Sequence, residues 1–149
     1  MTNKELILDV MRRQGRANAL NLRQAASGMD GTEVVAQEQD APAFVPGKDY
    51  SGWPVGAPIT DDGQVWQLLQ PYDSAAHPGS PGELRALWGL CHTKDPERAK
   101  PWVAPHGTSG MYMTGECYRA ADGTVYRCRS DNTVHDAEAL PSAWEEVQA

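Results

Sequence analysis

Apolar residues near the start of the chain follow a helical period. Thr2 followed by Glu5 is a capping-box pattern, which marks the first turn of a helix. The apolar residues that follow recur at three- and four-residue spacing: Leu6, Ile7, Val10 and Met11. Since glycine is a weak helix former, the pattern predicts a helix over residues 3–14 that ends at Gly15.

Weaker helical patterns continue as far as Pro42. Apolar residues recur less regularly over residues 19–26, and Asp30 or Thr32 is placed to cap a further short helix. These stretches carry little apolar area for a core of their own, so residues 1–41 are expected to form an N-terminal helical segment rather than a domain. Two alternatives follow: the segment packs on the rest of the chain, or it associates with copies of itself, for example as a trimer, or with a partner.

From Phe44 onward the pattern changes to Gly, Pro, aromatic residues and short alternating stretches, and it repeats. The second copy follows the first by 58 to 60 residues, with Phe44 matching Trp102, Gly56 matching Gly115, Ile59 matching Tyr118 and Trp66 matching Tyr126. Trp88 and Trp144 close the two copies, each after a proline. The repeat predicts two related modules, at residues 42–93 and 94–149.

Each module contains an Asp-Gly pair between strand-like stretches, at Asp62-Gly63 and Asp122-Gly123. Such pairs favour hairpin turns, so each module is expected to be a hairpin plus one more strand. So small a sheet needs a few large side chains for its core, and a repeat rich in aromatic residues supplies them. The predicted fold is α+β and mainly β, with Trp66, Trp88, Tyr126 and Trp144 in the cores.

The three cysteines leave one question open. A two-residue turn at Asp122-Gly123 would place Cys117 opposite Cys128 across the hairpin, which permits a disulfide without requiring one. The remaining cysteine, Cys91, has no Cys-x-x-Cys partner.

Charge and composition exclude several functions. With 13 Lys and Arg against 20 Asp and Glu, the net charge of −7 disfavours a nucleic-acid partner. No apolar run is long enough for a membrane helix, and no signal peptide is evident. The four histidines lack metal-ligand spacing, so neither a metal nor another cofactor is expected. Adjacent acids such as Asp61-Asp62 do not form the opposed pair of a glycosidase, which indicates that the protein is not an enzyme.

The repeated Gly-x-x-(Ile/Tyr), turn Gly, x-x-aromatic and later Pro…Trp pattern resembles the type-three chitin-binding modules, the carbohydrate-binding modules of families five and twelve. The resemblance covers residues 44–90 and 102–147. Five stretches also resemble small carbohydrate-binding proteins of prophages, associated with tail or cell-surface functions in phages of Gram-positive bacteria: residues 29–32, 48–50, 63–66, 85–96 and 107–112. The exposed Trp pair of the chitin-binding pattern is absent here from both modules.

The resemblance implies sugar binding without catalysis. The expected partners are a host cell-surface polysaccharide and phage tail proteins, and the expected location is the virion or the cell surface. Rings in turn-like, Gly- and Pro-flanked contexts are the candidates for stacking on a sugar: Trp53, Tyr72, Trp102 and Tyr112. Two other interpretations stay open, a structural adaptor of a tail that makes only protein contacts and an accessory module of a secreted hydrolase.

Overall fold

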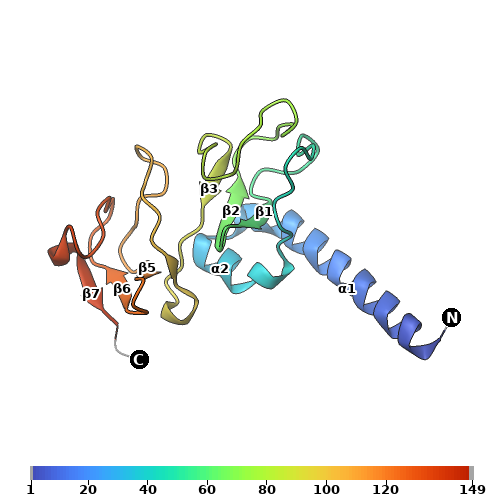
Figure 1. Cartoon of the computed structure of the whole chain (residues 1–149), viewed down its shortest axis with the longest axis horizontal. Helices are drawn as coiled ribbons and strands as arrows, with labels where there is room; N and C mark the ends of the chain where they lie inside the picture. Colours follow the sequence, from blue (N-terminus) through green and yellow to red (C-terminus); the bar gives the residue numbers. More distant parts are fainter. Residues whose placement is uncertain (1, 148–149) are drawn as a thin grey trace.

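The computed structural model describes residues 2–147 and has an α+β fold, as the sequence predicts (Figure 1). Two helices come first, α1 (Asn3–Ala25) and α2 (Gly31–Ala36). An antiparallel three-stranded sheet follows, with β1 (Pro58–Asp61), β2 (Gln64–Leu68) and β3 (Trp88–Leu90) in that order. The second sheet has the order β4 (Lys100–Pro101), β5 (Cys117–Arg119), β6 (Val125–Cys128) and β7 (Trp144–Glu146). Its short strand β4 pairs in parallel with β5.

Helix α1 is a single helix that continues through Gly15, so the predicted end at Gly15 is wrong. Both hydrogen bonds of the Thr2–Glu5 capping box form at its start. A glycine inside a helix costs only about 1 kcal/mol relative to alanine. The end of the helix is buried in the body of the molecule at Leu22 and at Ala26, the residue just after the helix. This packing holds the second half of the helix in place.

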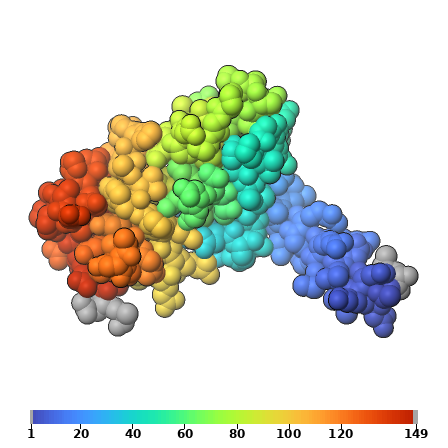
Figure 2. All heavy atoms as spheres, viewed as in Figure 1, coloured from blue at the N-terminus to red at the C-terminus, as the bar shows by residue number. Residues whose placement is uncertain are grey.

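Helix α2 joins the helical segment to the first sheet. Asp30 caps it, and the fully buried Val34 and Val35 pack in one cluster with Val65 of β2 and with Cys91. The segment therefore packs on the rest of the chain, which was the first of the two alternatives. The first half of α1 is different, since it projects away from both sheets (Figure 2). No helix in the described part of the chain combines the length and apolarity needed to cross a membrane.

The two hairpins differ by one residue. In the first, Asp61 pairs with Gln64, and Asp62 and Gly63 both have positive φ, as a tight two-residue turn requires. In the second, the backbone N–H of Ala120 donates to the carbonyl of Thr124 across a three-residue loop.

The extra residue in the second hairpin changes the register of the cysteines. Cys117 pairs with Arg127 rather than with Cys128, so the two-residue turn assumed for this hairpin is wrong. Because neighbouring residues of a strand point to opposite faces, the two sulfurs are separated by the sheet. The described structure has Cys91, Cys117 and Cys128 as free, buried thiols.

The aromatic cores of the two sheets have the same arrangement of rings. In the first, Phe44 stacks on Tyr50 at 5.7 Å, and Trp88 meets Phe44 edge-on at 6.0 Å and 81°. In the second, Trp102 stacks on Tyr112 at 4.8 Å, and Trp144 meets Trp102 edge-on at the same 6.0 Å and 81°. The expected matches of Phe44 with Trp102 and of Trp88 with Trp144 are therefore confirmed.

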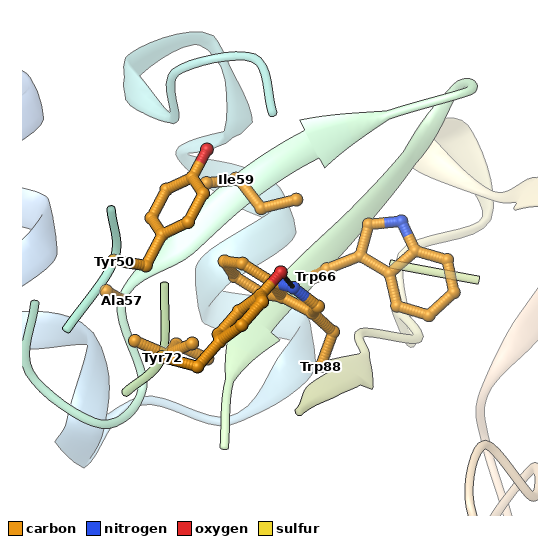
Figure 3. Packing of buried hydrophobic residues seen from close by; sticks show 7 residues of the cluster. Tyr50, Ala57, Ile59, Trp66, Tyr72 and Trp88 are labelled. Atoms are coloured by element: carbon orange, nitrogen blue, oxygen red, sulfur yellow. Dashed lines mark hydrogen bonds between the residues drawn. The ribbon is translucent and has the colours of Figure 1, made fainter. Parts of the chain in front are cut away.

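Tyr72 belongs to the first core, so the expectation of an exposed ring at this position is wrong. Its ring is only 6% exposed, and its hydroxyl accepts a 2.7 Å hydrogen bond from Nε1 of the fully buried Trp88 (Figure 3). The loop between β2 and β3 folds back over the sheet and carries Tyr72 inward. Figure 3 also shows the buried Trp66 ring apart from the Tyr50 and Trp88 rings.

Replacing Tyr72 by phenylalanine is expected to lower the free energy of unfolding by about 1–3 kcal/mol, because the buried indole N–H of Trp88 loses its acceptor. The matched control is Tyr126→Phe at a half-buried ring, with an expected change within about 0.5 kcal/mol. Urea unfolding followed by tryptophan fluorescence measures both. Equal losses in the two variants would contradict this role of Tyr72.

Candidate functional site

An open groove of about 1050 Å³ is found beside the second sheet. It lies between the segment that precedes β5, the β5–β6 turn and the loop from β6 to β7. Four aromatic residues line it, together with carboxylates and one guanidinium: Trp102, Tyr118, Tyr126, Trp144, Asp122, Asp136, Glu138 and Arg119.

The four rings divide into a buried floor and a more open rim. Tyr118 and Trp144 are 4% and 5% exposed and meet edge-on at 4.8 Å. Tyr126 stacks on Tyr118 at 5.5 Å, and Trp102 meets Tyr118 edge-on at 5.1 Å. Since Trp102 and Tyr126 are only half-buried, these two rings offer aromatic surface to a ligand.

Two hydrogen bonds hold the β6–β7 loop against this floor. The Trp144 indole donates to the carbonyl of His135 at 2.8 Å, and the backbone N–H of Ala137 donates to the Tyr118 hydroxyl at 2.9 Å. The loop residues on either side of Ala137 are Asp136 and Glu138, so these bonds set both carboxylates beside the rings. The groove is therefore built from residues whose backbone is fixed.

The equivalent ring of the first module is covered. Trp66 is 3% exposed, with the Arg85 guanidinium 5.0 Å from its ring centre and Gly82 close by. The loop that covers it spans residues 69–87, whereas the corresponding loop in the second module, residues 129–143, is four residues shorter. The short loop leaves Tyr126 half-exposed.

Tyr126 packs against the second core but is only half-buried, so its assignment to the core is confirmed in part. In the repeat, Tyr126 matches the buried Trp66, and the repeat alone gives no reason to expect the two rings to differ in exposure. A signal was present in the spacing, because Trp88 follows its turn glycine Gly63 by 25 residues and Trp144 follows Gly123 by 21. Sequence reasoning also missed Tyr118, Asp136 and Glu138 as groove residues.

A smaller hollow of about 440 Å³ occupies the matching place in the first module. Phe44 takes the position of Trp102 there, and the remaining lining comes mostly from small residues and proline, including Ser74, Pro78 and Gly79. This hollow lacks the second aromatic ring that makes the groove distinctive.

Of the four ring positions expected to bind sugar, the structure places only Trp102 in the groove. Tyr112 is 1% exposed and lies beneath Trp102, so the expectation of an exposed ring is wrong for Tyr112 as it is for Tyr72. Trp53 is half-buried in the other module, with the Arg23 guanidinium 3.8 Å from its ring centre. The four residues therefore do not form one surface.

The first module positions Trp102 through a stack of rings. His92, just after β3, lies 3.6 Å from Tyr112 in a nearly parallel stack, and Tyr112 in turn stacks on Trp102. The His92 Nε2–H donates to the carbonyl of Gly110 at 2.9 Å. The backbone N–H of Cys117 donates to Thr93, and the Gln64 amide donates to Pro101, so the junction is hydrogen-bonded on both sides of the stack.

Burial keeps His92 and Cys91 at the junction uncharged near neutral pH. Burial lowers the pKa of His92 to about 4, and the nearby Arg85 guanidinium lowers it further, against the hydrogen bond to Gly110. Burial raises the pKa of the Cys91 thiol to about 12, which disfavours a nucleophilic thiolate. Burial also raises the pKa of Tyr118, and the charge of Asp136 adds to this rise. No group of three His, Cys, Asp or Glu side chains is placed to hold a metal ion within residues 2–147.

The lowered pKa of His92 predicts a loss of stability in acid. An unfolded histidine binds a proton near pH 6.5, whereas the folded one does so only near pH 4, so the stabilisation is complete above pH 6.5 and falls as the pH drops toward 4. Up to about 3 kcal/mol is at stake. Thermal unfolding of His92→Gln should depend less on pH over this range than the parent protein, while His135→Gln, at an exposed site, should keep the parent slope. Equal slopes for all three proteins would contradict the effect.

Comparison with known proteins gives no relative for this chain: no protein-family model matches it, and no curated protein matches its sequence significantly. The resemblance to the chitin-binding modules therefore stays a prediction.

Proposed function

We propose that the protein is a non-catalytic carbohydrate-binding protein that binds a host cell-surface glycan through the groove of its second module. The observation that supports this is the pair of half-buried rings, Trp102 and Tyr126, in an open groove that also holds carboxylates. A pyranose packs its C–H face on an aromatic ring and donates hydrogen bonds from its hydroxyls to carboxylate oxygens. The groove offers both kinds of contact side by side.

The setting follows from the same proposal. A phage or prophage particle that touches its host needs a surface module with affinity for the wall polysaccharide, so the chain would act on the virion or at the cell surface, attached to tail proteins. A single shallow sugar site is weak, with a millimolar Kd corresponding to about 4 kcal/mol. Adhesion of this kind therefore depends on several copies binding together.

Replacing Trp102 or Tyr126 by alanine should reduce binding to purified host cell-wall polysaccharide by about two- to tenfold, because each change removes an aromatic face worth about 0.5–1.5 kcal/mol. Pull-down of wall fragments with a competing oligosaccharide measures this loss, and circular dichroism checks that each variant is folded. Trp53→Ala is the matched control outside the groove, with binding expected to stay unchanged. Full binding by the Trp102→Ala, Tyr126→Ala double variant would overturn the proposal.

A second function, self-association through α1, is favoured by a separate surface. Four apolar residues in the first half of α1 are largely exposed, on the part of the helix that projects from the body (Figure 2). The exposed fractions are 48% for Leu6, 61% for Ile7, 62% for Val10 and 63% for Met11. Apolar side chains at this spacing are typical of helix–helix contacts. The natural occupant is the same helix of a second copy.

The order of charges along α1 favours an antiparallel pair over the trimer considered from the sequence. After one basic residue at the start of the helix, Lys4, acidic Glu5 and Asp9 precede basic Arg12, Arg13 and Arg16. Two antiparallel helices that share the apolar stripe place the acidic part of each beside the basic part of the other, whereas a parallel assembly places like charges together. An antiparallel pair also carries the two grooves at opposite ends, which suits binding to a repetitive polysaccharide.

Ile7→Glu is expected to convert a dimer into a monomer, since it places a charge in the shared stripe. Light scattering coupled to size exclusion gives the mass directly. Leu20→Glu is the matched control, at a leucine that is 48% exposed but lies outside the Leu6–Met11 stripe, and it should remain dimeric. A monomeric parent protein would contradict self-association, and a trimeric one would contradict the antiparallel pair.

A further inference from the structure

We infer that the groove selects glycans with free amino groups, such as oligomers of glucosamine, over N-acetylated or anionic glycans; this inference rests on the proposed function of the groove. Three carboxylates line it, Asp122, Asp136 and Glu138, against a single guanidinium, Arg119. The lining therefore has an excess of negative charge beside its aromatic rings.

These carboxylates have no cationic partner within residues 2–147, where the ion pairs lie elsewhere. Asp136 and Asp122 accept backbone hydrogen bonds, from Ala139 and Thr124 at 2.9 Å each. These local bonds fix the two side chains and leave further lone pairs of each carboxylate for a ligand. The hydrogen bonds from Thr124 also lower the pKa of Asp122, which keeps it ionised.

Among the described residues, the guanidinium of Arg119 forms no ion pair with these carboxylates. Its nitrogens donate to the carbonyls of Gly123 and Pro96, at 3.3 and 3.5 Å. Gly123 follows Asp122 in the β5–β6 turn, so the first bond holds the guanidinium at this turn, and within residues 2–147 it forms no hydrogen bond with Asp136 or Glu138. The part of the groove near these two carboxylates stays negative.

A ligand that fits this part of the groove needs an apolar face and a cation. An amino sugar has both, since its ring packs on Trp102 or Tyr126 while its ammonium group donates to a carboxylate. An ammonium group near an aromatic face gains a further cation–π attraction. An N-acetyl group removes the charge, and a phosphate or uronic acid places like charge beside like charge. The charge on the sugar therefore decides which class of glycan binds more tightly, while the aromatic rings contact the sugar face that all the classes share.

The test is calorimetric titration of the full chain at pH 6 with glucosamine oligomers and with the same oligomers N-acetylated. At this pH ordinary carboxylates are ionised and aliphatic amines are protonated. The amino form should bind about tenfold tighter, and raising the salt from low to about 0.5 M should remove most of this difference. The Asp136→Asn, Glu138→Gln double variant should bind both oligomers equally. Glu146→Gln, an exposed carboxylate on β7 outside the groove lining, is the matched control and should keep the preference.

The possible results distinguish a failure of this inference from a failure of the proposed function. Equal affinity for the two oligomers in the parent protein, or tighter binding of the N-acetylated one, would overturn the inference and leave sugar binding standing. Binding of host wall polysaccharide without binding of glucosamine oligomers would have the same meaning. Failure of the wall polysaccharide and of both oligomers to bind would overturn the proposed function as well.

Discussion

The perpendicular contact between one buried tryptophan and a stack of two rings is what each half of the β region depends on. Three short strands cannot enclose an aliphatic core, so most of the buried area must come from a few large rings. Trp88 meets the Phe44–Tyr50 stack edge-on, and Trp144 meets the Trp102–Tyr112 stack in the same way. The repeated sequence produces this arrangement of rings twice.

The groove arises where the second copy leaves this arrangement incompletely covered. The short β6–β7 loop packs on Trp144 and Tyr118 through its backbone but does not reach over Tyr126. In the first module the longer loop brings Arg85 over Trp66 and closes the same place. The first sheet therefore has a closed core, whereas the second leaves part of its aromatic core open to the groove.

The junction makes the two copies work as one unit. His92 of the first module stacks on Tyr112, and Tyr112 supports Trp102 at the rim of the groove. The first module thus helps to position a side chain of the second, at the cost of burying a histidine that must stay neutral. A rigid rim ring is an advantage for sugar stacking because little side-chain entropy is lost on binding.

The amino-acid sequence by itself determined the α+β order, the duplication, the tight turn at Asp62-Gly63 and the burial of Trp66, Trp88 and Trp144. These follow from local turn chemistry and from the need of a small sheet for large apolar side chains, and both are visible in residue type and spacing. It did not determine the end of α1, because whether a helix continues past Gly15 depends on what its far end packs against.

Only the tertiary structure decided which rings face solvent. Tyr72 and Tyr112 stand in loop-like sequence contexts, yet long-range packing carries them inward against Trp88 and His92. Tyr126 stands at a core position, yet it is half-exposed because a loop elsewhere in the chain is four residues shorter. Exposure is set by what covers a side chain, and the covering residues are distant in sequence, so no local pattern around these tyrosines records it.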